Sequence, residues 1–233
     1  MQSEDRVIHF STELIHAPAT PNKPKLQKLY YDLSQIKGAG YESTDFTNPT
    51  QVRFYSRRGK KTQSIALFLP DRLVLIEEWA DIPLSTFGER VRIVAGLALE
   101  ARSVPCYLLH TATIRSTFAL SYFDDAKTFI IDHVCAQEGR IATYLQRPVA
   151  VGGIRLVLPE TNENPGAYHV TIESFRHSNN EVFVEVKGIF GRQQVFPGQE
   201  ESILDNIRNV RTYITDNIFP YLDQYDIPEN DNA

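Results

Sequence analysis

Cysteine is scarce in this sequence. Only Cys106 and Cys135 occur among 233 residues, and neither lies in a CxxC pair or at the spacing of zinc ligands. This usage is typical of a reducing compartment, so we expect free thiols and a cytoplasmic protein. A chain of this length can bury roughly 70% of its unfolded surface, so it needs no disulfide or metal for stability.

Long apolar runs are absent as well. No window approaches 18 uninterrupted apolar residues, so we expect no membrane-spanning helix. The first ten residues, MQSEDRVIHF, contain acidic residues where a secretory signal has basic residues and an apolar run. Both absences predict a protein without a membrane partner.

The chain also lacks a strong charge of one sign. Its formal net charge is -5 and its pI is about 5.7, whereas domains that bind polyanions are usually basic. The exception is YSRRGKKTQ, where Arg57, Arg58, Lys60 and Lys61 surround Gly59. We interpret it as a solvated hairpin tip whose charges discourage edge pairing. Nucleic-acid binding by this hairpin is an alternative, although the surrounding carboxylates disfavour it.

Motifs that name a reaction are missing. The sequence has no GxSxG elbow and no phosphate-binding loop, and GAGYES follows a predicted helix and lacks the third glycine of a dinucleotide fingerprint. The six histidines form no HxH, HxxxH or HExxH pattern: His9, His16, His110, His133, His169 and His177. We therefore predict no catalytic residue, no cofactor and no metal site.

Apolar periodicity is clear in residues 1–103. Ile8, Phe10 and Leu14 alternate with polar residues, which predicts a half-buried strand. The stretch KLQKLYYDLSQIKGAG predicts a helix, TQVRFYS, QSIALFLP and RLVLIEEW predict three strands, and DIPLSTFGERVRIVAGLALEARS predicts a second helix. A capping box of Thr86 with Glu89, or a cap by Asp81, is expected to begin that helix.

The order of elements starts again at residue 104. YLLHTATIRSTFAL predicts a long strand and DDAKTFIIDHVCAQ a helix, and AVGGIRLVLP, AYHVTIESF and EVFVEVKGIFG predict three strands. A long C-terminal helix follows. Its apolar stripe consists of Ile203, Ile207, Val210, Ile214, Ile218 and Leu222.

These patterns predict an α+β protein of two similar halves, 1–103 and 104–225. Each half is expected to be an antiparallel sheet backed by helices on one face, because that arrangement hides both the strand faces and the helix stripes. Only the order of elements repeats, so structural duplication is left open. Residues 226–233 are acidic and poor in apolar residues, and we expect a disordered tail there.

The layout resembles a sporadically distributed bacterial family without an assigned activity. Members of that family have an N-terminal strand and helix, a central strand with an arginine, and a long C-terminal helix; HTATIRSTFAL would be the arginine strand here. The element order is also similar to the duplicated saddle of the TATA-binding protein, which is an analogy of fold alone. Neither resemblance assigns a functional residue.

We predict a non-enzymatic role in which the protein binds another macromolecule or assembles with itself. A homodimer is one form that this self-assembly would take. The outward strand positions of the second half combine apolar and acidic residues, as an interface does. The candidate interface comprises the hairpin cations Arg57, Arg58, Lys60 and Lys61 together with Glu173, Glu181, Phe183, Glu185 and Ile189.

A small-ligand carrier or an unrecognised enzyme is the rival interpretation. It requires a pocket between sheet and helix, lined by Phe54, Phe68, Phe118, Phe190 and Tyr213. The same residues would equally fill a core.

Overall fold

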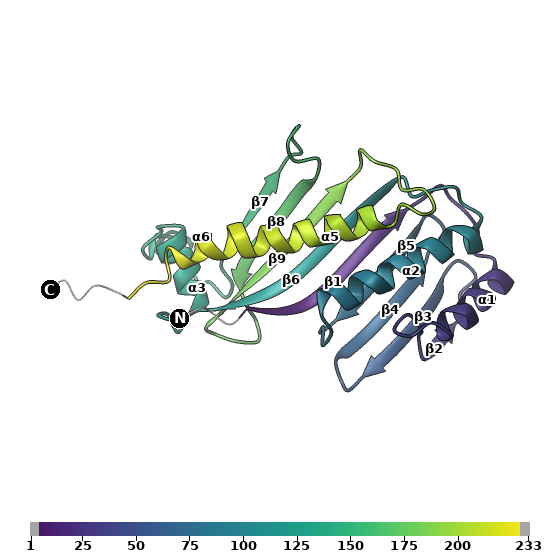
Figure 1. Cartoon of the computed structure of the whole chain (residues 1–233). Helices are drawn as coiled ribbons and strands as arrows, with labels where there is room; N and C mark the ends of the chain where they lie inside the picture. Colours follow the sequence, from purple (N-terminus) through teal and green to yellow (C-terminus); the bar gives the residue numbers. More distant parts are fainter. Residues whose placement is uncertain (1–4, 229–233) are drawn as a thin grey trace.

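Strands dominate the molecule. The computed structural model describes residues 5–228, in which nine antiparallel strands form a single sheet (Figure 1). The α+β antiparallel class is therefore confirmed. The strands are β1 (Asp5–Ile15), β2 (Ser43–Asp45), β3 (Val52–Arg58), β4 (Thr62–Phe68), β5 (Arg72–Glu78), β6 (Leu109–Ala119), β7 (Gly153–Leu158), β8 (Ala167–Ser174) and β9 (Glu181–Phe190).

The two expected sheets are joined at the centre. The strand order is β2-β3-β4-β5-β1-β6-β9-β8-β7, and β1 pairs with β6 from Asp5 opposite Phe118 to Ile15 opposite Leu109. Beside each central strand lies the last strand of its own half, β5 next to β1 and β9 next to β6. The strand connections thus run in the same order in both halves, while structural similarity between the halves stays a prediction.

Three long helical segments lie on one side of the sheet (Figure 1). They are α1 (Lys23–Ser34), α2 (Leu84–Arg102) and α5 (Glu201–Tyr213), the last continued by the π-helix η2 (Ile214–Ile218) and by α6 (Phe219–Asp223). The predicted long C-terminal helix is confirmed. All six residues of its apolar stripe are buried against the sheet: Ile203, Ile207, Val210, Ile214, Ile218 and Leu222.

The core fills the space between the sheet and these helices. Along β9 every second residue is buried, and Val182, Val184 and Val186 are fully covered. Apolar burial of this kind contributes roughly 25 cal/mol per Å². Three residues that the pocket interpretation required, Phe54, Phe68 and Phe118, are fully buried core residues.

The predicted start of α2 is wrong. Its N-cap is Pro83, and no side chain caps the first turn. Glu89 instead pairs with Arg92. Asp81 accepts hydrogen bonds from Arg58 on β3. The Asp81 carboxylate therefore forms an ion pair with Arg58 on β3 and does not cap α2.

Residues 124–137 contain less regular helix than their pattern predicts. The segment begins with α3 (Ala126–Thr128) and continues as the π-helix η1 (Phe129–Val134). Asp125 caps it by accepting a hydrogen bond from the Lys127 amide at 2.9 Å. Two short elements have no counterpart in the prediction, α4 (Arg140–Leu145) and β2.

The first residue of the predicted tail is held in place. The carboxylate of Asp226 is buried and accepts hydrogen bonds from the backbone amides of Ser121 at 2.7 Å and Tyr122 at 3.0 Å. Residues 229–233 of the predicted tail lie outside the described residues. Between residues 5 and 228, none of the helices has the length and apolar content to cross a membrane. Cys106 and Cys135 are free thiols.

Candidate functional site: the open face of the sheet

The long helices leave one side of the sheet without their cover. We call this side the open face; it carries the strand residues whose side chains point away from α1, α2 and α5. These side chains are mostly half-buried, because neighbouring strands place them about 5 Å apart. The open face is thus a broad surface of packed side chains, and every strand of the sheet contributes to it.

One row of residues crosses eight strands of the open face. Each member lies directly opposite the next in the strand register, and basic, acidic and neutral polar side chains follow one another along it. We call it the transverse row: Arg57, Gln63, Glu78, His9, Arg115, Glu185, Thr171 and Arg155.

His9 occupies the middle of the transverse row and is only 7% exposed. Its Nδ1 lies 2.7 Å from Glu78 Oε2, and its Nε2 lies 3.0 Å from Ser11 Oγ. On its other side, Arg115 Nε donates to Glu185 Oε2 at 2.6 Å. The hydrogen bond with His9, together with the charge of Arg115, holds the pKa of Glu78 below its ordinary value against the opposing effect of burial.

The order Ser11, His9, Glu78 is that of a nucleophile, a base and an orienting acid. Sequence analysis missed it, although His9 and Ser11 stand two residues apart on one strand and so share a face. The site has no backbone oxyanion hole. Ser11 is paired with Ile76 on one side and Thr113 on the other, so the adjacent amides of β1 are used in the sheet. We interpret the three residues as a chain of hydrogen bonds that connects β1 to β5.

A second charge cluster lies beside the transverse row. Glu13 accepts from Arg72 at 3.0 Å and from Lys187 at 3.3 Å, so one carboxylate ties β1 to β5 and to β9. Arg6 and Glu181 form a further pair at 3.3 Å. Positive and negative groups therefore neutralise one another locally across the open face.

The acidic and apolar part of the candidate interface lies on the open face. The register places the five residues on the same side of β8 and β9: Glu173, Glu181, Phe183, Glu185 and Ile189. Phe183 stacks on Phe175 with ring centroids 6.3 Å apart. Apolar side chains continue on the other half of the same face with Ile65 and Ile76.

The basic hairpin does not form one surface. Arg57 lies on the open face, 5.7 Å from the centroid of the Tyr55 ring. Arg58, its neighbour on β3, points to the helix side and donates to the buried Glu77 at 2.9 Å. Lys60 is exposed at the turn, and Lys61 Nζ lies 4.7 Å from the Trp79 ring centroid.

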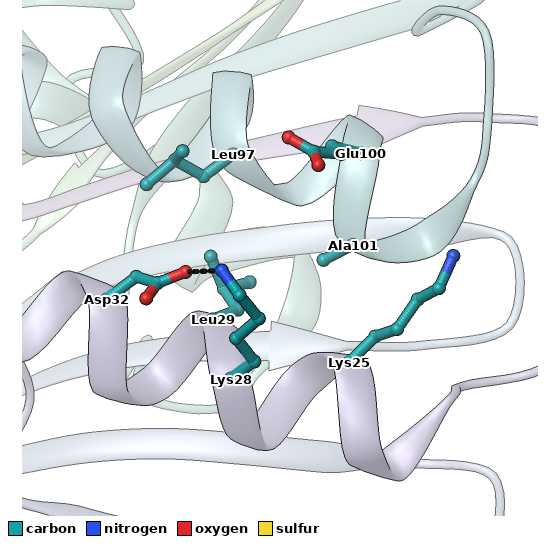
Figure 2. A pocket seen from close by; sticks show the side chains of 7 residues that line it. All are labelled: Lys25, Lys28, Leu29, Asp32, Leu97, Glu100 and Ala101. Atoms are coloured by element: carbon teal, nitrogen blue, oxygen red, sulfur yellow. Dashed lines mark hydrogen bonds and ion pairs between the residues drawn. The ribbon is translucent and has the colours of Figure 1, made fainter.

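A groove lies between α1 and α2 on the helix side (Figure 2). It has a volume of about 180 Å³, and its polar side chains are largely paired. Lys28 binds Asp32 at 2.6 Å, and Lys25 donates to Ser103 at 2.7 Å. Because its charges are of both signs and largely paired with each other, the groove offers no distinct ligand chemistry.

A larger groove of about 270 Å³ lies between α5, η2 and the loop that joins β7 to β8. Phe190, Tyr168 and Tyr213 give it aromatic walls, and the two tyrosine rings lie 4.9 Å apart. Asn206 also lines the groove, and its amide lies 2.8 Å from Nε2 of the buried His110. Two of the five residues of the pocket interpretation, Phe190 and Tyr213, therefore do line a groove.

Comparisons with known proteins do not assign this chain to a family. Neither the models of known protein families nor the curated proteins contain a match to this chain. Membership of the sporadically distributed bacterial family stays a prediction. Within residues 5–228, no three His, Cys, Asp or Glu side chains come together as ligands for a metal ion.

Proposed function

We propose that this chain is a non-enzymatic binding protein whose open face receives a protein partner. The observation that carries the proposal is the composition of that face, where apolar residues such as Phe183 and Ile189 lie among side chains that already neutralise one another. Apolar area surrounded by polar groups is the usual anatomy of a protein interface.

Local neutralisation favours a protein over a nucleic acid as the partner. Binding to a phosphate backbone draws its affinity from cations that replace counterions. On the open face, Arg115, Arg72 and Lys187 are each paired with a glutamate. A phosphate would have to compete with those carboxylates, whereas a protein surface can pack on the paired groups.

The aromatic side chain of Phe183 allows a direct test with the full-length protein. A photoreactive phenylalanine analogue is introduced at Phe183 and, as a matched control, at Tyr31, which is 64% exposed on α1. After irradiation in the native cell, we expect one discrete protein adduct from position 183 and none from position 31. Adducts of equal yield at both positions, or an adduct only with nucleic acid, would contradict the proposal.

The larger groove supports a second function, the carriage of a small ligand. Aromatic walls with amide groups suit a neutral, polar ligand with one flat apolar side, such as a sugar or a heterocyclic base. Native mass spectrometry of the protein purified from its own cells tests this function. A retained mass that disappears in Tyr213→Ala supports it, and a bare protein mass in the wild type argues against it.

A further inference from the structure

The two edges of the sheet are built differently. One edge is β2, which has only three residues, Ser43–Asp45, and short edge strands limit unwanted pairing. The other edge is β7, Gly153–Leu158, which has six residues and pairs with β8 on one side. In the part of the chain that the structure describes, its other side has no strand partner. An edge of this length is a ready template for another strand.

Exposed apolar side chains are frequent on β7 and in the chain segment that precedes it. Of the eleven large apolar residues that are exposed within the described residues, five lie in the short stretch 144–157. The β7 residues among them are 43% and 59% exposed and occupy both faces of the strand. The five are Tyr144, Leu145, Val151, Leu156 and Val157. Leu156 and Val157 thus leave apolar area uncovered beside the unpaired edge, which is a common property of interaction sites.

We propose that β7 pairs with the β7 strand of a second copy of this chain. Self-pairing of antiparallel strands follows a two-fold axis, and a two-fold dimer is the commonest closed assembly. The register of this pairing follows from the backbone and from the single charge that β7 carries, Arg155.

The backbone groups available for pairing follow from the β7–β8 ladder. Gly152 accepts a hydrogen bond from the Ser174 amide at 3.1 Å, so the Gly152 carbonyl points toward β8. Backbone direction alternates along a strand, so Ile154 and Leu156 also point their N–H and C=O groups to β8. Gly153, Arg155 and Val157 therefore present theirs at the free edge.

Charge and strand overlap together select one register. An axis at Ile154 keeps the two arginines apart but overlaps only residues 153–155 of the two strands, whereas an axis at Leu156 overlaps residues 154–158. An axis at Leu156 places each Arg155 opposite the partner's Val157, and both residues have free N–H and C=O groups to exchange. An axis at Arg155 places two guanidinium groups directly opposite each other, which is unfavourable. An axis at Val157 overlaps only residues 156–158 of the two strands and leaves Arg155 opposite the partner's Pro159, outside the strand and without an N–H to donate.

The Leu156 register has a clear structural consequence. Directly opposite residues of an antiparallel pair point to the same side, so the helices of both copies lie on one side and the open faces join on the other. Leu156 meets the partner's Leu156 at the axis, on the side of the buried Val170 and Ile172. The dimer thus covers apolar area that the monomer exposes.

A pair of charge substitutions at one site tests the dimer and its register. Sedimentation equilibrium of the full-length wild type, up to roughly 100 µM, is expected to show a monomer–dimer equilibrium. Val157→Lys puts an ammonium opposite the partner's Arg155 twice per dimer and is expected to raise the Kd about tenfold or more. Val157→Glu is expected to leave the Kd unchanged or lower it, because it faces the same arginine.

A proline substitution separates pairing from folding. Val157→Pro removes the N–H that points to the free edge and keeps the ladder to β8, so we expect a folded monomer with a circular dichroism spectrum like that of the wild type. A monomeric wild type at all concentrations, or a dimer that is equally sensitive to Val157→Lys and Val157→Glu, would overturn the proposal. So would a dimer that Val157→Pro leaves intact. The outcome is independent of the cross-linking test at Phe183, since sedimentation uses the purified chain alone.

Discussion

Arg58 on β3 donates to Glu77 on β5 across 2.9 Å, on the helix side of the sheet. The Glu77 side chain is only 1% exposed, and it also accepts from Ser64 at 2.9 Å and from Arg90 on α2. A residue of the apparent basic surface thus satisfies a buried carboxylate. Because Arg58 is bound to Glu77 on the helix side, it cannot bind a ligand together with Arg57 on the open face.

Glu77→Gln is expected to destabilise the fold by about 3 to 5 kcal/mol, because it leaves the buried Arg90 without its charged partner and removes one of the two carboxylates that bind Arg58. Glu78→Gln is the matched control, since Glu78 is the next residue, points to the open face and has a side chain that is 33% exposed. We expect the control to cost about 1 kcal/mol or less. Urea unfolding of both variants measures the difference, and equal losses would contradict the assigned roles.

Burial lowers the pKa of His110 from about 6.5 to about 4. Between pH 4 and pH 6.5, His110 therefore binds a proton in the unfolded chain but not in the folded chain. The free energy of unfolding is therefore unaffected by His110 above pH 6.5. It falls by about 3 kcal/mol in total as the pH is lowered to 4 and below. His110→Gln should flatten this part of the curve of unfolding free energy against pH. If the unfolding free energy of the variant depends on pH as steeply as that of the wild type, groups other than His110 cause the dependence.

Gly153→Ala is expected to destabilise the protein by about 1 to 3 kcal/mol through overpacking. A Cβ there would lie 2.7 Å from the Ile172 carbonyl oxygen, which belongs to the backbone of β8 and cannot move aside easily. Gly191→Ala is the control, because its Cβ would meet only the Leu109 side chain, at 3.3 Å. Thermal unfolding compares the two variants, and a control that loses as much as Gly153→Ala would remove the steric explanation.

Ser11 is expected to be chemically unreactive despite its hydrogen bond to His9. Without donors for a developing oxyanion, its attack on an ester or a phosphonate would lack the main source of transition-state stabilisation. Intact-mass analysis after incubation with a fluorophosphonate probe should show no adduct. Labelling that is lost in Ser11→Ala would establish an enzyme and would displace the binding proposal.

Local patterns predicted which segments form strands and helices. Val182, Val184 and Val186 recur at every second position, beside Glu181, Glu185 and Lys187 on the other face, and that period places them on the buried side of a strand. The six-residue stripe of the C-terminal helix is equally readable, because its spacing is that of one helical face. The five candidate interface residues of β8 and β9 lie on one face for the same reason.

Pairing between distant segments depended on the tertiary structure. Any two strands offer similar backbone hydrogen bonds, so periodicity does not say that β1 lies between β5 and β6. That placement brings His9 to Glu78 and leaves β7 at an edge. The sequence by itself determined the apolar side of each segment, since that property is local. Only the folded sheet decided the neighbours of each polar side chain, because those contacts join residues far apart in the chain.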